Sequence, residues 1–336
     1  MLPRLNPMVY NLGQRRCTLA AVTNEIKPAS GGIKSIFRGL TRTKRRRDTI
    51  DGYLFILPVV LGILIFNVVP MIVSFAWSFT EYPMLRSPVF VGLQNYIDLF
   101  TKNTHFLGSI LVTVTFALTA IPLGIVGAFI LAILLNQRVK GIAFFRTCFY
   151  IPTVVPAISS AILWGWLLNP DYGLVNSILW KLHLPTSRFL ASSNSALGSL
   201  ILMSLWGIGG GMVIYLAGLQ SVSESLYESA KIDGANELQL FWFITLPMMT
   251  PTIFYNLVMG LIGAFQYFLP AYVLTAGGPL YATYFYGYML WETAFHFTAM
   301  GMASAMAWIL LVAILALTLL IFRSATSWVY YETEVK

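Results

Sequence analysis

Long stretches without charged residues alternate with short polar segments along most of this 336-residue chain. A charged side chain at the centre of a bilayer costs about 2.5–3.5 kcal/mol on insertion scales, and a helix needs roughly 20 apolar residues to cross the hydrocarbon core. Charge-free stretches of that length therefore predict membrane-spanning helices. About six are expected, near residues 52–80, 106–136, 147–168, 196–219, 246–270 and 299–322.

Two clusters of basic residues predict how these helices are oriented. One lies between positions 38 and 47, before the first stretch, and the other follows the second stretch as Arg138, Lys140 and Arg146. Cytoplasmic loops carry an excess of Lys and Arg, so both clusters are expected in the cytoplasm. An even number of spans then places both the N and C termini there. The predicted fold class is an all-α, polytopic protein embedded in the lipid bilayer.

Composition divides the chain into three parts. Residues 1–50 are rich in Gly, Ser, Lys and Arg, which predicts a disordered cytoplasmic extension. Residues 51–325 form the transmembrane domain, and residues 326–336 form a short cytoplasmic tail. Within the domain, residues 173–182 predict a short surface helix. The glycines at positions 207 and 209–211 allow either close helix approach or a distorted turn in the fourth span.

The composition and the remaining motifs exclude several function classes. Hydrophobic residues make up 57% of the chain and charged residues 10%, against roughly 45–50% and about 25% in soluble domains. The net charge is +8, and the first basic cluster alone holds six basic residues, which explains the charge without a nucleic-acid partner. Cys17 and Cys148 form no redox pair or disulfide framework. No phosphate-binding loop, metal-ligand spacing or catalytic motif is present, so no enzyme activity, cofactor or metal is predicted on this chain.

One polar, mixed-charge segment interrupts the second half of the chain. Residues 221–237 read SVSESLYESAKIDGANE and fall between the fourth and fifth predicted spans, on the cytoplasmic side. Acidic residues such as Glu224 and Glu228 favour the positive end of a helix dipole by a few tenths to about 1 kcal/mol. Gly234 can adopt a positive φ and let the chain enter a second helix at a new angle. The segment therefore predicts two short helices joined by a turn.

The spacing in this segment resembles a known signature. Three residues separate the triplet ending at Ala230 from Gly234, and nine separate Gly234 from Ile244, which precedes a Leu-Pro pair by one residue. This is similar to the pattern of permease subunits of bacterial binding-protein-dependent ABC importers, with Ser229 in place of an alanine. The motifs FVGLQNY and YVLTAGGP extend the resemblance toward the carbohydrate-type branch, which includes maltose, lactose and glycerol-phosphate permeases.

The resemblance implies a function and a set of partners. The chain would be a permease of the bacterial inner membrane that couples to a separate ATPase through a helix between spans four and five. The expected partners are an ATPase dimer that holds ATP and Mg, a second, homologous permease subunit and an extracytoplasmic solute-binding protein. Whether the chain pairs with itself instead stays open. The implied coupling residues are Glu228, Ser229, Ala230, Asp233, Gly234, Ala235, Leu246 and Pro247.

Two other function classes compete with this interpretation: a standalone secondary carrier and a membrane-embedded enzyme. A proton- or sodium-coupled carrier is expected to place charged residues at midspan, yet only Glu292, near the outer end of the last hairpin, comes close. An enzyme would need a nucleophile or metal cluster. Neither alternative explains residues 228–247.

The scarcity of intramembrane charge predicts a neutral, hydroxyl-rich cargo such as a sugar or oligosaccharide. Aromatic faces with a few amide or hydroxyl groups would line its path. The aromatic candidates have an alternative role in the interfacial belt, and the amides have one in helix–helix contacts. The candidate path residues are Gln266, Tyr267, Phe268, Asn256, Trp164 and Trp166.

Overall fold

The computed structural model describes residues 44–137 and 139–330. Most of the predicted N-terminal extension, Arg138 and the last six residues of the predicted tail lie outside the described residues. The chain forms two compact units, residues 1–66 and 67–336. Each unit is described by itself.

The first unit contains helix α2 (Lys44–Ile63), which runs directly from the basic cluster into the apolar stretch. Residues 44–50 are therefore helical, which corrects the predicted boundary of the disordered extension. Pro58 lies inside α2 without ending it. The π-helix η1 (Leu64–Val68) follows and leads into α3 (Val69–Ser78), where Pro70 occupies the first turn. A proline in a continuing helix removes one backbone donor and crowds the preceding turn, and the wider π turn relieves that crowding.

The second unit is helical apart from one small sheet, in which Thr80 pairs with Phe90 and Glu81 with Val89 in antiparallel register. Its elements in chain order are β1 (Thr80–Glu81), β2 (Val89–Phe90), α4 (Gln94–Thr101), α5 (Phe106–Leu135), α6 (Ile142–Val154), α7 (Ala157–Leu167), α8 (Leu174–Lys181), η2 (Phe189–Ala191), α9 (Ala196–Leu205), α10 (Gly209–Ser221), α11 (Glu224–Ile232), α12 (Glu237–Leu240), η3 (Phe241–Thr245), α13 (Leu246–Phe265), α14 (Leu269–Leu274), α15 (Tyr286–Trp291), η4 (Glu292–His296) and α16 (Met300–Trp328).

Within the described residues, four helical segments are long and apolar enough to cross a membrane, and two bent helix pairs raise the number to six. The third predicted span bends by 100° between α6 and α7, and the fourth bends by 42° between α9 and α10. The sharper bend falls at Val155, which is extended because it precedes Pro156. Helix α8 confirms the short helix predicted for residues 173–182.

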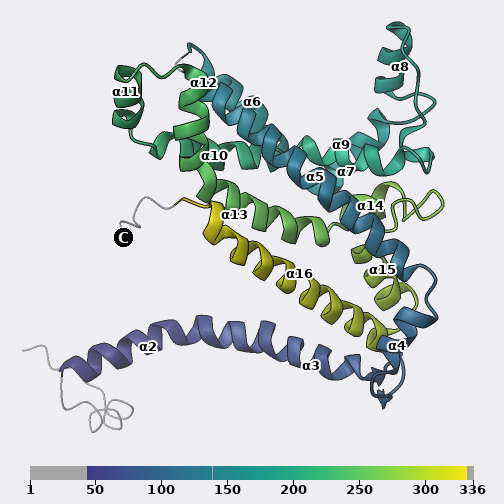
Figure 1. Ribbon diagram of the computed structural model, residues 1–336. Coiled ribbons are helices and arrows are strands. Elements are labelled where there is room, and N and C mark those ends of the chain that lie inside the picture. Colours follow the sequence, from purple (N-terminus) through teal and green to yellow (C-terminus); the bar gives the residue numbers. More distant parts are fainter. Residues whose placement is uncertain (1–43, 138, 331–336) are drawn as a thin grey trace, which may run out of the picture. The chain divides into compact units, whose positions relative to one another are not determined.

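Helix α5 organises the second unit because α9, α10, α13 and α15 all pack against it. One apolar cluster gathers around the first half of α5 and includes Phe116 and Phe285. Another surrounds its second half and includes Phe129 and Met249. In Figure 1 the α11–α12 hairpin and the α4–α15 region lie near opposite ends of α5.

The glycine run of the fourth span produces both predicted effects. The chain turns at residues 206–208, between α9 and α10. Immediately afterwards, a Cβ atom at Gly209 would collide with the carbonyl oxygen of Phe149 in α6. Helices α6 and α10 therefore meet backbone to backbone, which only a glycine permits at this position.

Candidate translocation cavity and coupling hairpin

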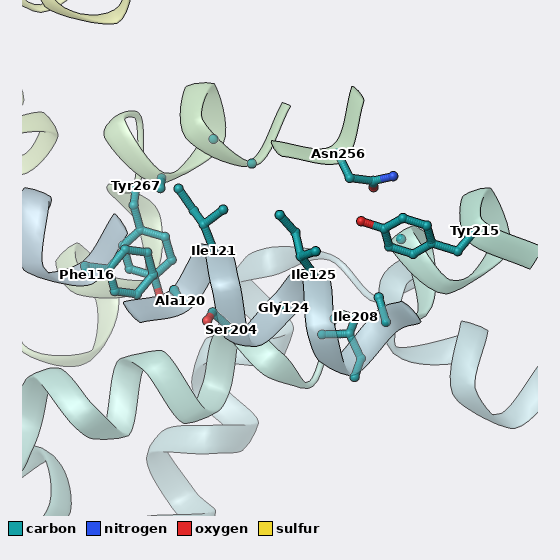
Figure 2. A pocket seen from close by; sticks show the side chains of 16 residues that line it. Phe116, Ala120, Ile121, Gly124, Ile125, Ser204, Ile208, Tyr215, Asn256 and Tyr267 are labelled. Carbon is teal, nitrogen blue, oxygen red and sulfur yellow. The ribbon is translucent and has the colours of Figure 1, made fainter. Parts of the chain in front are cut away.

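An open cavity of about 300 Å³ lies beside the middle of α5 and is lined also by residues of α9, α10 and α13 (Figure 2). Small residues open the space: a Cβ at Gly211 would touch Ala128 of α5, and one at Gly260 would touch Ile121. The side chains that surround it are mostly apolar. Among the described residues that line the cavity, none is charged, and the polar side chains are Ser204, Tyr215, Asn256 and Tyr267.

Two of these polar side chains have buried hydroxyl groups without a hydrogen-bond partner in the described part of the chain, those of Tyr215 and Tyr267. A buried polar group left unpaired costs about 1–3 kcal/mol. Figure 2 shows Tyr215 near Asn256 toward one end of the cavity, and Tyr267 beside Phe116 toward the other. The ring centroids of Phe116 and Tyr267 are 4.3 Å apart. The cavity thus presents unsatisfied hydroxyl groups on an apolar wall.

Asn256 supplies an amide next to Tyr215. Its Nδ2 donates to the carbonyl oxygen of Thr252, 2.9 Å away in the preceding turn of α13. That bond orients the amide, and its Oδ1 lies 3.6 Å from the position that a Cβ at Gly211 of α10 would take. An amide oxygen held in this way can accept a hydrogen bond from a ligand hydroxyl.

Of the six predicted path residues, the structure brings only Asn256 and Tyr267 to this cavity. Gln266 is exposed at the end of α13. The ring of Phe268 stacks instead on Tyr272 and Tyr288. These positions separate because α13 ends at Phe265, so that successive residues point in different directions.

The two tryptophans of α7 also lie away from the cavity. Trp164 packs edge-on against Trp206, with a centroid separation of 6.0 Å. Trp166 is 53% exposed. Tyr215 was not among the predicted path residues. It lies in a charge-free stretch, where the sequence does not distinguish a cavity-lining tyrosine from one in the core.

The polar segment after α10 forms the predicted pair of short helices, α11 and α12. Gly234 adopts a φ of +85°, and the amide of Ala235 donates to the carbonyl of Ala230 at 2.9 Å, which closes α11. Asn236 then caps α12 in a reciprocal arrangement with Gln239, at 2.8 and 2.9 Å. The turn is therefore well defined by hydrogen bonds.

Most of this coupling hairpin, defined as residues 221–247, projects away from the rest of the unit. Leu238 is 68% exposed and Leu226 is also exposed. Among the predicted coupling residues, Ala230 and Ala235 are half-buried and the others in the turn are exposed. The half-buried Leu246 and Pro247 instead begin α13. The predicted coupling residues that are exposed are Glu228, Ser229, Asp233 and Gly234.

Two contacts stabilise the region where the coupling hairpin meets the helices of the cavity. The Tyr227 hydroxyl lies within hydrogen-bond distance of Thr245. The Arg146 guanidinium donates from Nε and Nη2 to the carbonyl of Leu135, the last residue of α5, at 3.2 and 2.8 Å. Arg146, Tyr227 and Glu228 line a common surface pocket. Tyr227 thus connects α11 to the residue before α13, while Arg146 joins α6 to the end of α5 beside the hairpin.

Comparison with known proteins identifies the family. Residues 120–327 match the family described as binding-protein-dependent transport system inner membrane components. A probable ABC transporter permease protein of Bacillus subtilis, YesP, is 41% identical over 293 residues, which cover 86% of this chain and 94% of that protein. The trehalose/maltose transport system permease protein MalF of Thermococcus litoralis is 35% identical over 246 residues, covering 73% and 83%.

A solved structure agrees with these sequence matches. The crystal structure of a bacterial alginate ABC transporter, in complex with an alginate pentasaccharide-bound periplasmic protein, contains a chain that matches with a TM-score of 0.73 and 25% identity. The match covers 83% of this chain and 95% of that chain. The chain belongs to the binding-protein-dependent inner-membrane permeases of ABC transporters. It is a multi-pass protein of the cytoplasmic (inner) membrane.

These matches confirm the helical, polytopic fold class and the family inferred from the signature at residues 228–247. The relatives are transport permeases rather than enzymes. The cytoplasmic location of the two termini stays a prediction. In the described residues, no group of three or more His, Cys, Asp or Glu side chains is placed to hold a metal ion.

Proposed function

We propose that this chain forms half of the translocation path of an ATP-driven importer for a neutral sugar or oligosaccharide. The observation that carries the proposal is the cavity beside α5, with its uncharged lining and the hydroxyls of Tyr215 and Tyr267, which have no hydrogen-bond partner among the described residues. A sugar offers many hydroxyl groups, each able to donate and to accept. Such a ligand would satisfy both tyrosines and the Asn256 amide at once.

The apolar wall suits the same class of ligand. The C–H faces of a sugar ring are apolar and pack well against the aromatic rings of Phe116 and Tyr267. A charged cargo would instead leave its charge in a low-dielectric site without a counter-charge, which is costly. The cavity volume of about 300 Å³ is at the lower end of ordinary ligand pockets. A second membrane subunit, facing the same space, would complete the path.

The relatives support a carbohydrate cargo by name. The Thermococcus litoralis permease belongs to a trehalose/maltose system, and the solved transporter has an alginate pentasaccharide on its periplasmic protein. A permease from Yersinia pestis belongs to a system for sn-glycerol-3-phosphate. Because these cargoes differ in charge, the uncharged lining of this cavity is what favours a neutral sugar here.

The coupling hairpin would receive work from a separate ATPase dimer, which would bind ATP and Mg. Moving a permease from 1:99 to 99:1 between two states takes about 5.5 kcal/mol of differential interaction. A segment that transmits this must be rigid and accessible. The hairpin is both, because Asn236 and Gln239 cap each other, Lys231 pairs with Glu237 at 3.3 Å, and its turn is exposed. An extracytoplasmic solute-binding protein would deliver the cargo.

The proposal is tested by uptake measurements on the importer reconstituted in vesicles with its ATPase and solute-binding protein. The double variant Tyr215→Phe, Tyr267→Phe removes only the two hydroxyls and is expected to lower sugar uptake strongly. Tyr255→Phe, at an exposed position of α13, is the matched control and should transport normally. Unchanged uptake and unchanged sugar preference in the double variant would show that this cavity is not the path.

A further inference from the structure

A second and larger cavity, of about 740 Å³, lies at the other end of α5 from the coupling hairpin. Asn103 and His105, just before α5, form one side, and residues 276–281 together with Tyr284 and Glu292 form the other. The 30 residues of α5 span roughly 45 Å at 1.5 Å per residue, more than the hydrocarbon core of a bilayer. A hairpin in the cytoplasm therefore puts this outer cavity on the extracytoplasmic side.

Aromatic rings form a continuous surface along the outer cavity. The His105 and Tyr281 rings are stacked with centroids 3.9 Å apart and an interplanar angle of 24°. Tyr284 meets the Tyr281 ring edge-on, at 5.3 Å and 87°. Tyr281 is 54% exposed while Tyr284 is buried. The Tyr281 ring thus stands over the cavity with His105 and Tyr284 holding it in place.

A carboxylate lies within reach of this aromatic surface. Glu292 is partly buried and accepts a hydrogen bond from the hydroxyl of Tyr284. Burial, and then the Glu292 carboxylate, raise the pKa of the Tyr284 phenol, so it stays protonated and keeps donating. A carboxylate has about four acceptor positions, and the phenols of Tyr284 and Tyr288 both lie within hydrogen-bond reach of this one. Glu292 therefore keeps acceptor capacity for groups that enter the cavity.

The turn at residues 275–283 is held firmly enough to shape a binding site. The hydroxyls of Thr275 and Thr283 lie 2.7 Å apart, and Thr283 donates to the carbonyl of Gly278 at 2.6 Å. Gly277 has a φ of +80°, and a Cβ there would lie 2.6 Å from the Tyr284 ring. The turn therefore packs directly against the side chain that binds Glu292.

We propose that the outer cavity is a second carbohydrate site, where a neutral oligosaccharide stacks on Tyr281 and donates hydroxyl hydrogen bonds to Glu292 before it reaches the inner cavity. The apolar C–H face of a sugar ring can pack on the exposed ring of Tyr281, while the hydroxyl groups at its edge can donate to the carboxylate of Glu292. The volume accommodates several sugar units, more than the inner cavity does. This inference rests on the proposed import of a neutral sugar.

The test uses the full chain in lipid nanodiscs and saturation-transfer difference NMR with maltotriose, cellotriose and xylotriose as probes. Transfer to at least one trisaccharide is expected. In the Tyr215→Phe, Tyr267→Phe background, which lacks the inner-cavity hydroxyls, Tyr281→Ala should abolish it. Tyr281→Phe keeps the ring and should retain the signal. Tyr281 is 54% exposed, so its truncation should cost the fold little, and an unchanged thermal midpoint of the variant checks this. Glu292→Gln should weaken the signal by removing the charged acceptor.

A second comparison separates this site from the inner cavity. The double variant Tyr215→Phe, Tyr267→Phe should keep the trisaccharide signal, and that result supports the outer site whatever the uptake assay gives. Absence of transfer to all three probes would overturn the outer site. A trisaccharide signal that Tyr281→Ala leaves unchanged would also overturn it. If that variant keeps the signal but no longer binds the solute-binding protein, residues 276–281 are a protein-docking turn and not a sugar site.

Discussion

The Tyr227 hydroxyl of α11 lies 3.0 Å from the Thr245 hydroxyl, at the last residue before α13 begins. Thr245 also donates to the carbonyl of Leu240, 3.3 Å away, at the end of α12. The pair therefore connects both short helices of the coupling hairpin to the helix that carries Asn256. A displacement of α11 would reach the inner cavity through this contact.

The first prediction concerns this contact. Tyr227→Phe removes one hydrogen bond, worth about 0.5–1.5 kcal/mol, so uptake per ATP hydrolysed should fall several-fold while the ATPase stays bound. Parallel measurements of uptake and ATP hydrolysis in vesicles would check it. Tyr255→Phe, on the exposed face of α13, should match the wild type. Equal coupling ratios in all three proteins would remove Tyr227 from the transmission route.

The turn of the coupling hairpin gives the second prediction. Gly234 has open space around it but a positive φ, so substitutions act through backbone strain rather than collision. A β-branched residue is strongly disfavoured there, whereas Asn tolerates this conformation. Gly234→Val should release the ATPase in co-purification while the permease remains in the membrane. Gly234→Asn should retain it, and loss of the ATPase from both variants would point to side-chain contact instead.

Tyr215 gives a prediction that separates stability from transport. Its buried hydroxyl has no partner in the described part of the chain, whereas the Tyr286 hydroxyl donates to the carbonyl of Met306 at 2.8 Å. Tyr215→Phe should therefore keep or raise the thermal midpoint of the purified protein and still reduce uptake. Tyr286→Phe should lower the midpoint, because it removes a buried hydrogen bond worth about 0.5–1.5 kcal/mol. A lower midpoint for Tyr215→Phe would mean that this hydroxyl has a structural role.

The junction of α5 and α6 gives a fourth prediction. The charged guanidinium of Arg146 donates twice to the Leu135 carbonyl at the negative end of α5. Hydrogen bonds from charged groups contribute about 1.5–3 kcal/mol, so Arg146→Met should destabilise the protein by that order in thermal unfolding. Arg146→Lys keeps the charge but loses the forked geometry, and an intermediate midpoint is expected. Identical midpoints for Met and Lys would show that the charge contributes little.

The sequence predicted much of this fold because the cost of charge in a bilayer is large and local. Charge-free stretches located the spans, and the φ of Gly234 follows from the need to turn between two short helices. The bends were harder to predict. The backbone conformation of a residue before proline is restricted toward the extended region wherever it occurs. The 100° angle between α6 and α7 depends in addition on what the two helices pack against.

The cavity residues were only partly predictable for a similar reason. Asn256 and Tyr267 were among the candidates because amide and aromatic side chains in charge-free stretches suit a neutral, hydroxyl-rich cargo. Tyr215 was not, since a tyrosine in an apolar stretch usually belongs to the core. Gln266 was expected at the cavity, but the end of α13 at Phe265 turns it outward. The position at which α13 ends, rather than the residue type, decided that Tyr267 reaches the cavity and that Gln266 and Phe268 do not.

The contact of Gly209 with Phe149 limits how the permease can change shape. With no side chain between the two backbones, α6 and α10 have no soft layer that could compress or slide as the helices shift. We therefore expect the two helices to move together when the permease changes shape, and the bending to fall at the breaks next to them, near Val155 and near residues 206–208.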